Sequence, residues 1–192
     1  MMTNVETHIA GDSGDDWLKH YYFSRAVFSI LWVAAALTAG RQSFPVAAVL
    51  LVIYPAWDAA ANYVDAIRNG GLAKNRSQAI NIGVSSVMTV AVVIALTIGM
   101  NWVLGAFGLW AIFSGLSQLG TAVRRWKTRG GQWAMVLSGG QSALAGAFFI
   151  AQALKPVEPS IANVAGYAGF GAFYFLVSAI WLTVGRMRQK AA

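Results

Sequence analysis

The sequence contains no cysteine, only two histidines, and charged residues at only 11% of its positions. Without cysteine, the chain has no disulfide bond, no thiolate nucleophile and no cysteine-ligated metal. Two histidines are too few to build a metal site by themselves. The sequence also offers no nucleophile with a base and an orienting partner, and no phosphate-binding glycine loop after a strand. We therefore expect no enzymatic activity, no cofactor and no metal ion.

Apolar residues make up 57% of the 192 residues, which is more than a soluble core of this size can enclose. A membrane-spanning helix needs about 20 mainly apolar residues. The apolar runs therefore predict an all-α polytopic membrane protein with six transmembrane helices and almost no domain outside the membrane. We expect this domain to cover residues 17–188. The polar, acidic residues 1–16 predict a disordered N-terminal tail, and residues 189–192 a short C-terminal tail.

One pattern of an aromatic, a small polar and a basic residue occurs three times with the same internal spacing. Each copy lies in the second helix of a pair joined by a short turn. We therefore predict three antiparallel hairpin repeats, at about 17–68, 77–125 and 132–188. The copies of the pattern are Tyr54, Asp58 and Arg68; Trp110, Ser114 and Arg124; and Tyr174, Ser178 and Arg188.

The net charge of +7 is distributed unevenly along the chain. All lysines and arginines except Arg41 and Lys155 lie near the start of the first helix, in the two longer connections or at the C-terminal end. Because lysine and arginine accumulate on the cytoplasmic side of a membrane, this distribution predicts that both termini are cytoplasmic. The basic residues form short clusters beside apolar runs and no basic face, so we expect no nucleic-acid partner.

A family resemblance is carried by the three hairpins, by the segment FGLWAIFSGLSQLGTAVRR of residues 107–125 and by the following GQWAMVLSG of residues 131–139. In these features the sequence resembles the HdeD-like family of bacterial inner-membrane proteins, which are built from short membrane repeats. The resemblance covers most of residues 17–188. It implies a six-helix protein of the bacterial cytoplasmic membrane with a link to acid resistance, and it provides no active-site residues. Where the family usually has a small or acidic residue in the closing helix, this chain has Asp58, Ser114 and Ser178, so we expect no threefold acidic site.

Asp58 is the most unusual residue, because it lies about 13 residues into the second predicted helix and so near the middle of the bilayer. An ionised carboxylate there costs at least about 2.5–3.5 kcal/mol, so Asp58 needs a partner or a proton. Arg25 of the first helix is a candidate partner, since it lies at nearly the same depth. Asn62 and Asp65 follow on the same face of the helix, and Lys19 is a candidate partner for Asp65.

Two other predicted helices carry polar residues at helical spacing. We expect Asp58, Arg25, Asn62 and Gln118 to form an intramembrane polar site. One hypothesis is a path for a proton or small solute in which Asp58 titrates; the other is a set of interhelical hydrogen bonds that holds the helices in register. The two polar stripes are Ser77, Asn81, Ser85 and Thr89, and Ser114, Gln118, Thr121 and Arg125.

Small residues recur four positions apart on several predicted helices. This spacing allows helix backbones to approach closely in lipid. We expect it to serve packing within the chain, with a face for a homo-oligomer or another membrane protein as the alternative; the lipid bilayer is the other expected partner. The pairs are Ala56 and Ala60; Ala111 and Gly115; Ser138, Ser142 and Gly146; and Ala165 and Gly169.

Overall fold

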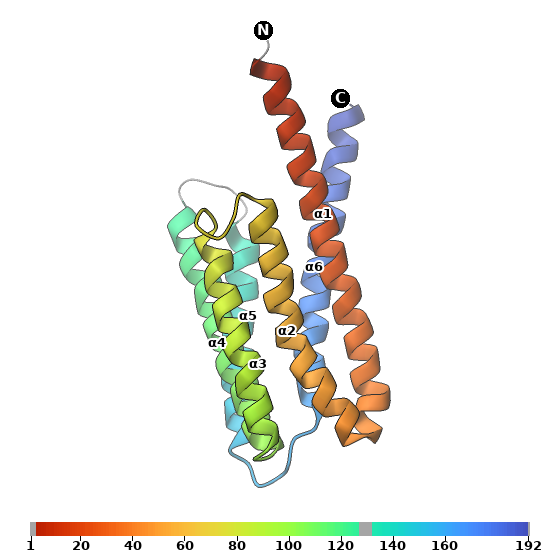
Figure 1. The fold of residues 1–192 in the computed structure, drawn as a ribbon, viewed down its shortest axis with the longest axis vertical. Coiled ribbons are helices and arrows are strands. Elements are labelled where there is room, and N and C mark those ends of the chain that lie inside the picture. Colours follow the sequence, from red (N-terminus) through yellow and green to blue (C-terminus); the bar gives the residue numbers. More distant parts are fainter. Residues whose placement is uncertain (1–2, 127–131, 192) are drawn as a thin grey trace. The chain divides into compact units, whose positions relative to one another are not determined.

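A computed structural model describes residues 3–126 and 132–191 of the chain (Figure 1). Within these residues the fold is entirely helical and contains no strand. The elements are α1 (Thr3–Ala35), a π-helical segment η1 (Ala36–Gly40), α2 (Phe44–Arg68), α3 (Arg76–Leu96), α4 (Met100–Arg125), α5 (Gln132–Ala153) and α6 (Ile161–Ala191).

Within the described residues, five helices are long and apolar enough to cross a membrane. This supports the prediction of a helical membrane protein. The sixth predicted span, α5, is 22 residues long and is not among these five. The six-span arrangement therefore stays a prediction. The five spans are Trp17–Gly40, Phe44–Arg68, Arg76–Leu96, Met100–Gly120 and Ile161–Gly185.

The two ends of the chain differ from the tails that the sequence predicts. Helix α1 begins at Thr3, so residues 3–16 extend α1 where a disordered tail was predicted. Extending an existing helix is much easier than nucleating a new one, which explains how a polar segment continues α1. At the other end, α6 runs to Ala191 through most of the predicted tail 189–192. The basic residues Lys127 and Arg129 lie outside the described residues.

The chain divides into two compact units. Unit 1 comprises Met1–Leu31 and Ala168–Ala192, and unit 2 comprises Trp32–Tyr167. In unit 1, α1 packs against α6 through aromatic residues: the rings of Tyr22 and Phe175 stack with centroids 6.3 Å apart.

In unit 2, α2, α3, α4 and α5 alternate in direction, and each contacts the next (Figure 1). The most extensive of these contacts is between α4 and α5. Pro45 lies in the first turn of α2, where its missing N–H would have no partner in any case. Asn101 at the start of α4 donates hydrogen bonds to the carbonyl oxygens of Ala153 (2.9 Å) and Lys155 (3.0 Å), which ties α4 to the end of α5.

Glycines allow the backbones of α4 and α5 to touch. A Cβ atom added to Gly108 would lie 2.8 Å from the carbonyl oxygen of Gly146, and one added to Gly139 would lie 2.8 Å from that of Gly115. The predicted packing role of small residues is thus confirmed at Gly115 and Gly146. It is not found at Gly169, where an added Cβ would meet no atom within 4 Å.

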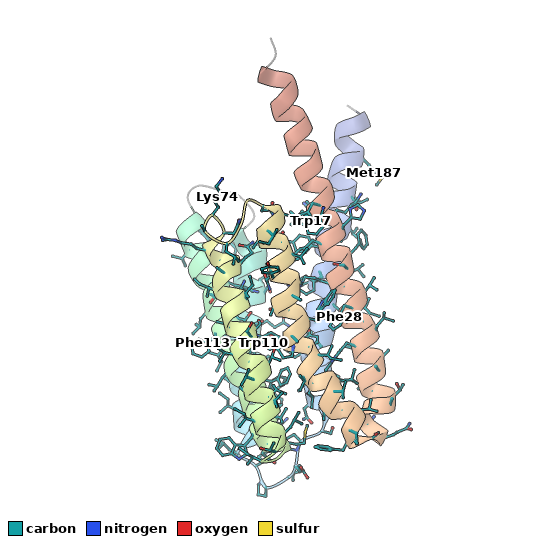
Figure 2. The ribbon with its side chains drawn as sticks, viewed as in Figure 1. Trp17, Phe28, Lys74, Trp110, Phe113 and Met187 are labelled. Atoms are coloured by element: carbon teal, nitrogen blue, oxygen red, sulfur yellow. The ribbon has the colours of Figure 1, made fainter. Side chains whose placement is uncertain are left out.

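A chain of aromatic rings fills the middle of unit 2. The ring centroids of Trp32 and Tyr54 are 4.7 Å apart, those of Tyr54 and Trp110 are 5.9 Å apart, and those of Trp110 and Phe107 are 5.8 Å apart. Tyr54 and Trp110 are the aromatic residues of two copies of the predicted repeat. In these two copies the aromatic position therefore contributes a ring to the packing inside unit 2. Phe113, one turn after Trp110 on α4, is 57% exposed (Figure 2).

Candidate functional site

Asp58 of α2 contacts α3 inside unit 2. Its Oδ2 atom accepts a hydrogen bond from the Ser85 hydroxyl at 2.7 Å and another from the Asn62 side-chain amide at 3.2 Å. The same amide donates to the Asp58 carbonyl oxygen at 2.8 Å. Ser85 and Asn62 are only 1% and 6% exposed, so Asp58 is held by buried neutral donors.

Asp65 lies two helical turns further along α2 and has a matching set of partners. Its Oδ1 atom accepts a hydrogen bond from the Asn69 side-chain amide at 2.8 Å, and its Oδ2 atom accepts one from Gln78 of α3 at 3.0 Å. The Asn69 amide also donates to the Asp65 carbonyl oxygen at 2.8 Å. Asp65 is 5% exposed.

The two carboxylates therefore form two similar stations between α2 and α3. In each station an aspartate of α2 is bound by the asparagine four residues later in the chain and by one polar residue of α3. Both the aspartates and their α3 partners are seven residues apart, which places the stations about 10 Å apart along the antiparallel helices. An ionised carboxylate only accepts hydrogen bonds, so the amides and the Ser85 hydroxyl all act as donors at these stations.

The predicted grouping of Asp58, Asn62 and Asp65 on one face of α2 is confirmed by these contacts. The polar stripe predicted for α3 is confirmed only in part. Ser85 meets Asp58, but Ser77 is exposed, and Gln78 is the residue that binds Asp65.

Thr89, the last member of the α3 stripe, donates at 2.8 Å to the Ser85 carbonyl oxygen of its own helix. The hydrogen bond of the Thr89 hydroxyl is therefore made within α3 and does not reach another helix.

Arg25, the predicted partner of Asp58, belongs to unit 1. There its Nη1 atom donates to the Tyr21 hydroxyl at 2.8 Å, and its guanidinium carbon lies 4.4 Å from the centre of the Phe175 ring. A guanidinium this close to an aromatic face gains a cation–π attraction. Since Asp58 belongs to unit 2, the pairing of Arg25 with Asp58 stays a prediction, and so does that of Lys19 with Asp65.

Gln118, the remaining candidate, lies where α4 meets α5. Its Cβ atom is 3.1 Å from the position that a Cβ on Gly139 would occupy. The buried amide oxygen of Gln118 has no hydrogen-bond partner among the residues that the structure describes. The structure thus brings Asp58 and Asn62 together and positions Gln118 at the close contact of α4 with α5.

Tyr167 of α6 is a polar residue of unit 2 that the sequence reasoning missed. Its hydroxyl lies 3.3 Å from the Ser142 hydroxyl of α5, and the centroid of its ring lies 5.9 Å from that of Phe149. A tyrosine inside a membrane span needs a hydrogen-bond partner for its hydroxyl, and this requirement could have indicated from the sequence that Tyr167 takes part in a polar contact.

Comparisons of the chain with protein-family models, curated proteins and solved structures give no match.

Proposed function

We propose that this chain is an integral protein of the bacterial cytoplasmic membrane with six spans, arranged as three hairpin repeats, and with both termini in the cytoplasm. It acts structurally or through partner proteins in the response to envelope or acid stress, as the resemblance to the HdeD-like family implies. Five apolar helices support the membrane assignment, and the uneven distribution of lysine and arginine supports the orientation. No catalytic step is part of this proposal.

The observation that carries the structural role is the pair of carboxylate stations between α2 and α3. Each carboxylate is bound from its own helix and from the neighbouring helix. Interhelical hydrogen bonds in membranes contribute about 0.6 kcal/mol on average and up to about 1.7 kcal/mol. Two stations therefore stabilise the α2–α3 pair and also fix its register, because a shift of one residue would separate both aspartates from their partners.

A stress phenotype with point variants tests this role in cells. A strain without the gene is expected to survive acid shock less well than the wild type, and Asp58→Asn and Asp65→Asn should lower survival in proportion to the loss of folded protein in the membrane. Survival that is equal in the deletion strain and the wild type would refute the stress role. Survival that falls while the amount of folded protein is unchanged would refute the structural role.

The second candidate function is a path for a proton or a small solute around Asp58. It is favoured by the burial of Asn62, Ser85 and Asp65 along the contact of α2 with α3 and by the hydroxyls of Ser142 and Tyr167 in the same unit. Purified protein in proteoliposomes with acidic external buffer tests it. This candidate requires that wild-type protein acidifies the vesicle interior and that Asp58→Asn does not; equal rates in protein-free vesicles would refute it.

A further inference from the structure

The connection between α2 and α3 presents a basic surface that the proposed function does not use. We call it the basic loop and define it as Arg68, Leu72, Lys74 and Arg76, all of which are exposed. The spans of α2 and α3 end at Arg68 and begin at Arg76, so the basic loop lies at the boundary between membrane and water. Figure 2 shows Lys74 extending from this connection away from the helices.

The backbone beneath the basic loop is held in one conformation. The Asn75 side-chain amide donates to three carbonyl oxygens, those of Asn69 (2.9 Å), Gly71 (2.9 Å) and Ala66 (3.3 Å). Gly70 and Gly71 have φ angles of 96° and 89°, which residues with a Cβ rarely adopt. These contacts fix the loop, so its basic side chains start from defined positions.

Lys74 is positioned by the absence of a side chain at Gly70. A Cβ added to Gly70 would lie 3.2 Å from Cδ of Lys74 and 4.0 Å from its Nζ atom. The aliphatic part of the Lys74 side chain therefore passes beside Gly70, and its ammonium group lies beyond it. A substitution at Gly70 would displace this group.

No acidic residue follows Lys74 and Arg76 closely in the sequence. After Asp65, the next acidic residue is Glu158. The first turn of α3 contains no acidic residue, and the positive end of its helix dipole points to the same place.

Leu72 places an exposed apolar side chain among the basic residues of the loop. Its side chain is 41% exposed at the loop, where it can enter the boundary between headgroups and acyl chains. Exposed leucine flanked by lysine and arginine at a membrane surface fits an anionic lipid, because the apolar side chain enters the membrane and the cations meet the phosphates.

We propose that the basic loop binds the phosphate of an anionic phospholipid headgroup, with Lys74 and Arg76 as the binding cations and Leu72 inserted beside the lipid. This site is independent of the stations at Asp58 and Asp65. Each basic residue near an anionic membrane contributes about 1 kcal/mol, which corresponds to about a fivefold change in affinity.

Binding of pyrene-labelled phosphatidylglycerol to the purified full chain in neutral detergent micelles tests the site. The double variant Lys74→Ala/Arg76→Ala is expected to weaken binding about 25-fold, at about fivefold per residue. The exchange Lys74→Arg/Arg76→Lys keeps both charges and is expected to preserve binding. Lys155→Ala removes an exposed lysine from the α5–α6 connection and serves as the matched control, with no expected effect.

Three results would overturn the proposal. In the first, the double variant binds as tightly as Lys155→Ala while its circular dichroism shows the same helix content as the wild type. In the second, labelled phosphatidylcholine binds as tightly as phosphatidylglycerol, so that the headgroup charge is not recognised. In the third, inorganic phosphate displaces the lipid at equal concentration, which would assign the loop to free phosphate.

Discussion

The contact between α4 and α5 leads to a sharp prediction, because two adjacent glycines of α5 should respond to the same substitution in opposite ways. A Cβ on Gly139 would lie 2.8 Å from the Gly115 carbonyl oxygen and 3.1 Å from Cβ of Gln118. A Cβ on Gly140 would meet no atom within 4 Å.

The expected magnitudes follow from these distances. Gly139→Ala forces the α4 and α5 backbones apart, and such overpacking costs about 1–3 kcal/mol. Gly140→Ala has free space and gains helix propensity of up to about 1 kcal/mol. The same gain in helix propensity applies at Gly139, so the free energy of unfolding of the two variants should differ by about 1–3 kcal/mol, with Gly139→Ala the less stable of the two.

Reversible unfolding of the purified protein in mixed micelles, followed by circular dichroism, measures this difference. Gly120→Ala on α4 provides a second control, since an added Cβ there also meets no atom within 4 Å. If Gly139→Ala proves as stable as Gly140→Ala, then α4 and α5 do not touch at their backbones, and our account of this contact is refuted.

Two further predictions concern single hydrogen-bond donors. Trp32→Phe removes the indole N–H that donates to the Leu50 carbonyl oxygen at 2.7 Å. This variant should lower the free energy of unfolding by about 1 kcal/mol. An unchanged free energy of unfolding would contradict that hydrogen bond. Asn75→Ala removes three hydrogen bonds from the α2–α3 connection and should speed proteolysis within residues 69–75 at unchanged helix content; equal cleavage rates in the wild type and the variant would argue against a fixed loop.

Much of the helical fold could be predicted from the sequence. The apolar runs predict the helices, and the spacing of Asp58, Asn62 and Asp65 correctly predicts the buried polar face of α2. These features depend only on local chemistry. Their agreement with the structure reflects the strict length and hydropathy that a bilayer requires.

The error on α3 has a geometric cause. At 3.6 residues per turn, a position seven residues from Ser85 is rotated by only about 20°, whereas a position eight residues away is rotated by about 80°. A stripe drawn at four-residue intervals therefore drifts off the face that meets α2, and Gln78, which is not a member of the predicted stripe, is the residue that binds Asp65.

Helix neighbours could not be predicted either. The small residues signal close packing, but their spacing does not specify that α4 makes its most extensive contact with α5. The same limit explains Gln118, whose place beside Gly139 depends on how α4 and α5 pack, and Tyr167, whose partner Ser142 is on another helix.

The most direct test of the account is a double-mutant cycle on Asp58 and Ser85, measured by unfolding in mixed micelles. Asp58→Ala and Ser85→Ala should show a coupling of about 0.6–1.7 kcal/mol. The same cycle with Ser86→Ala, which alters the exposed neighbour of Ser85, should show additive effects. Additive effects of Asp58→Ala and Ser85→Ala, within about 0.3 kcal/mol, would contradict a structural role for the station at Asp58.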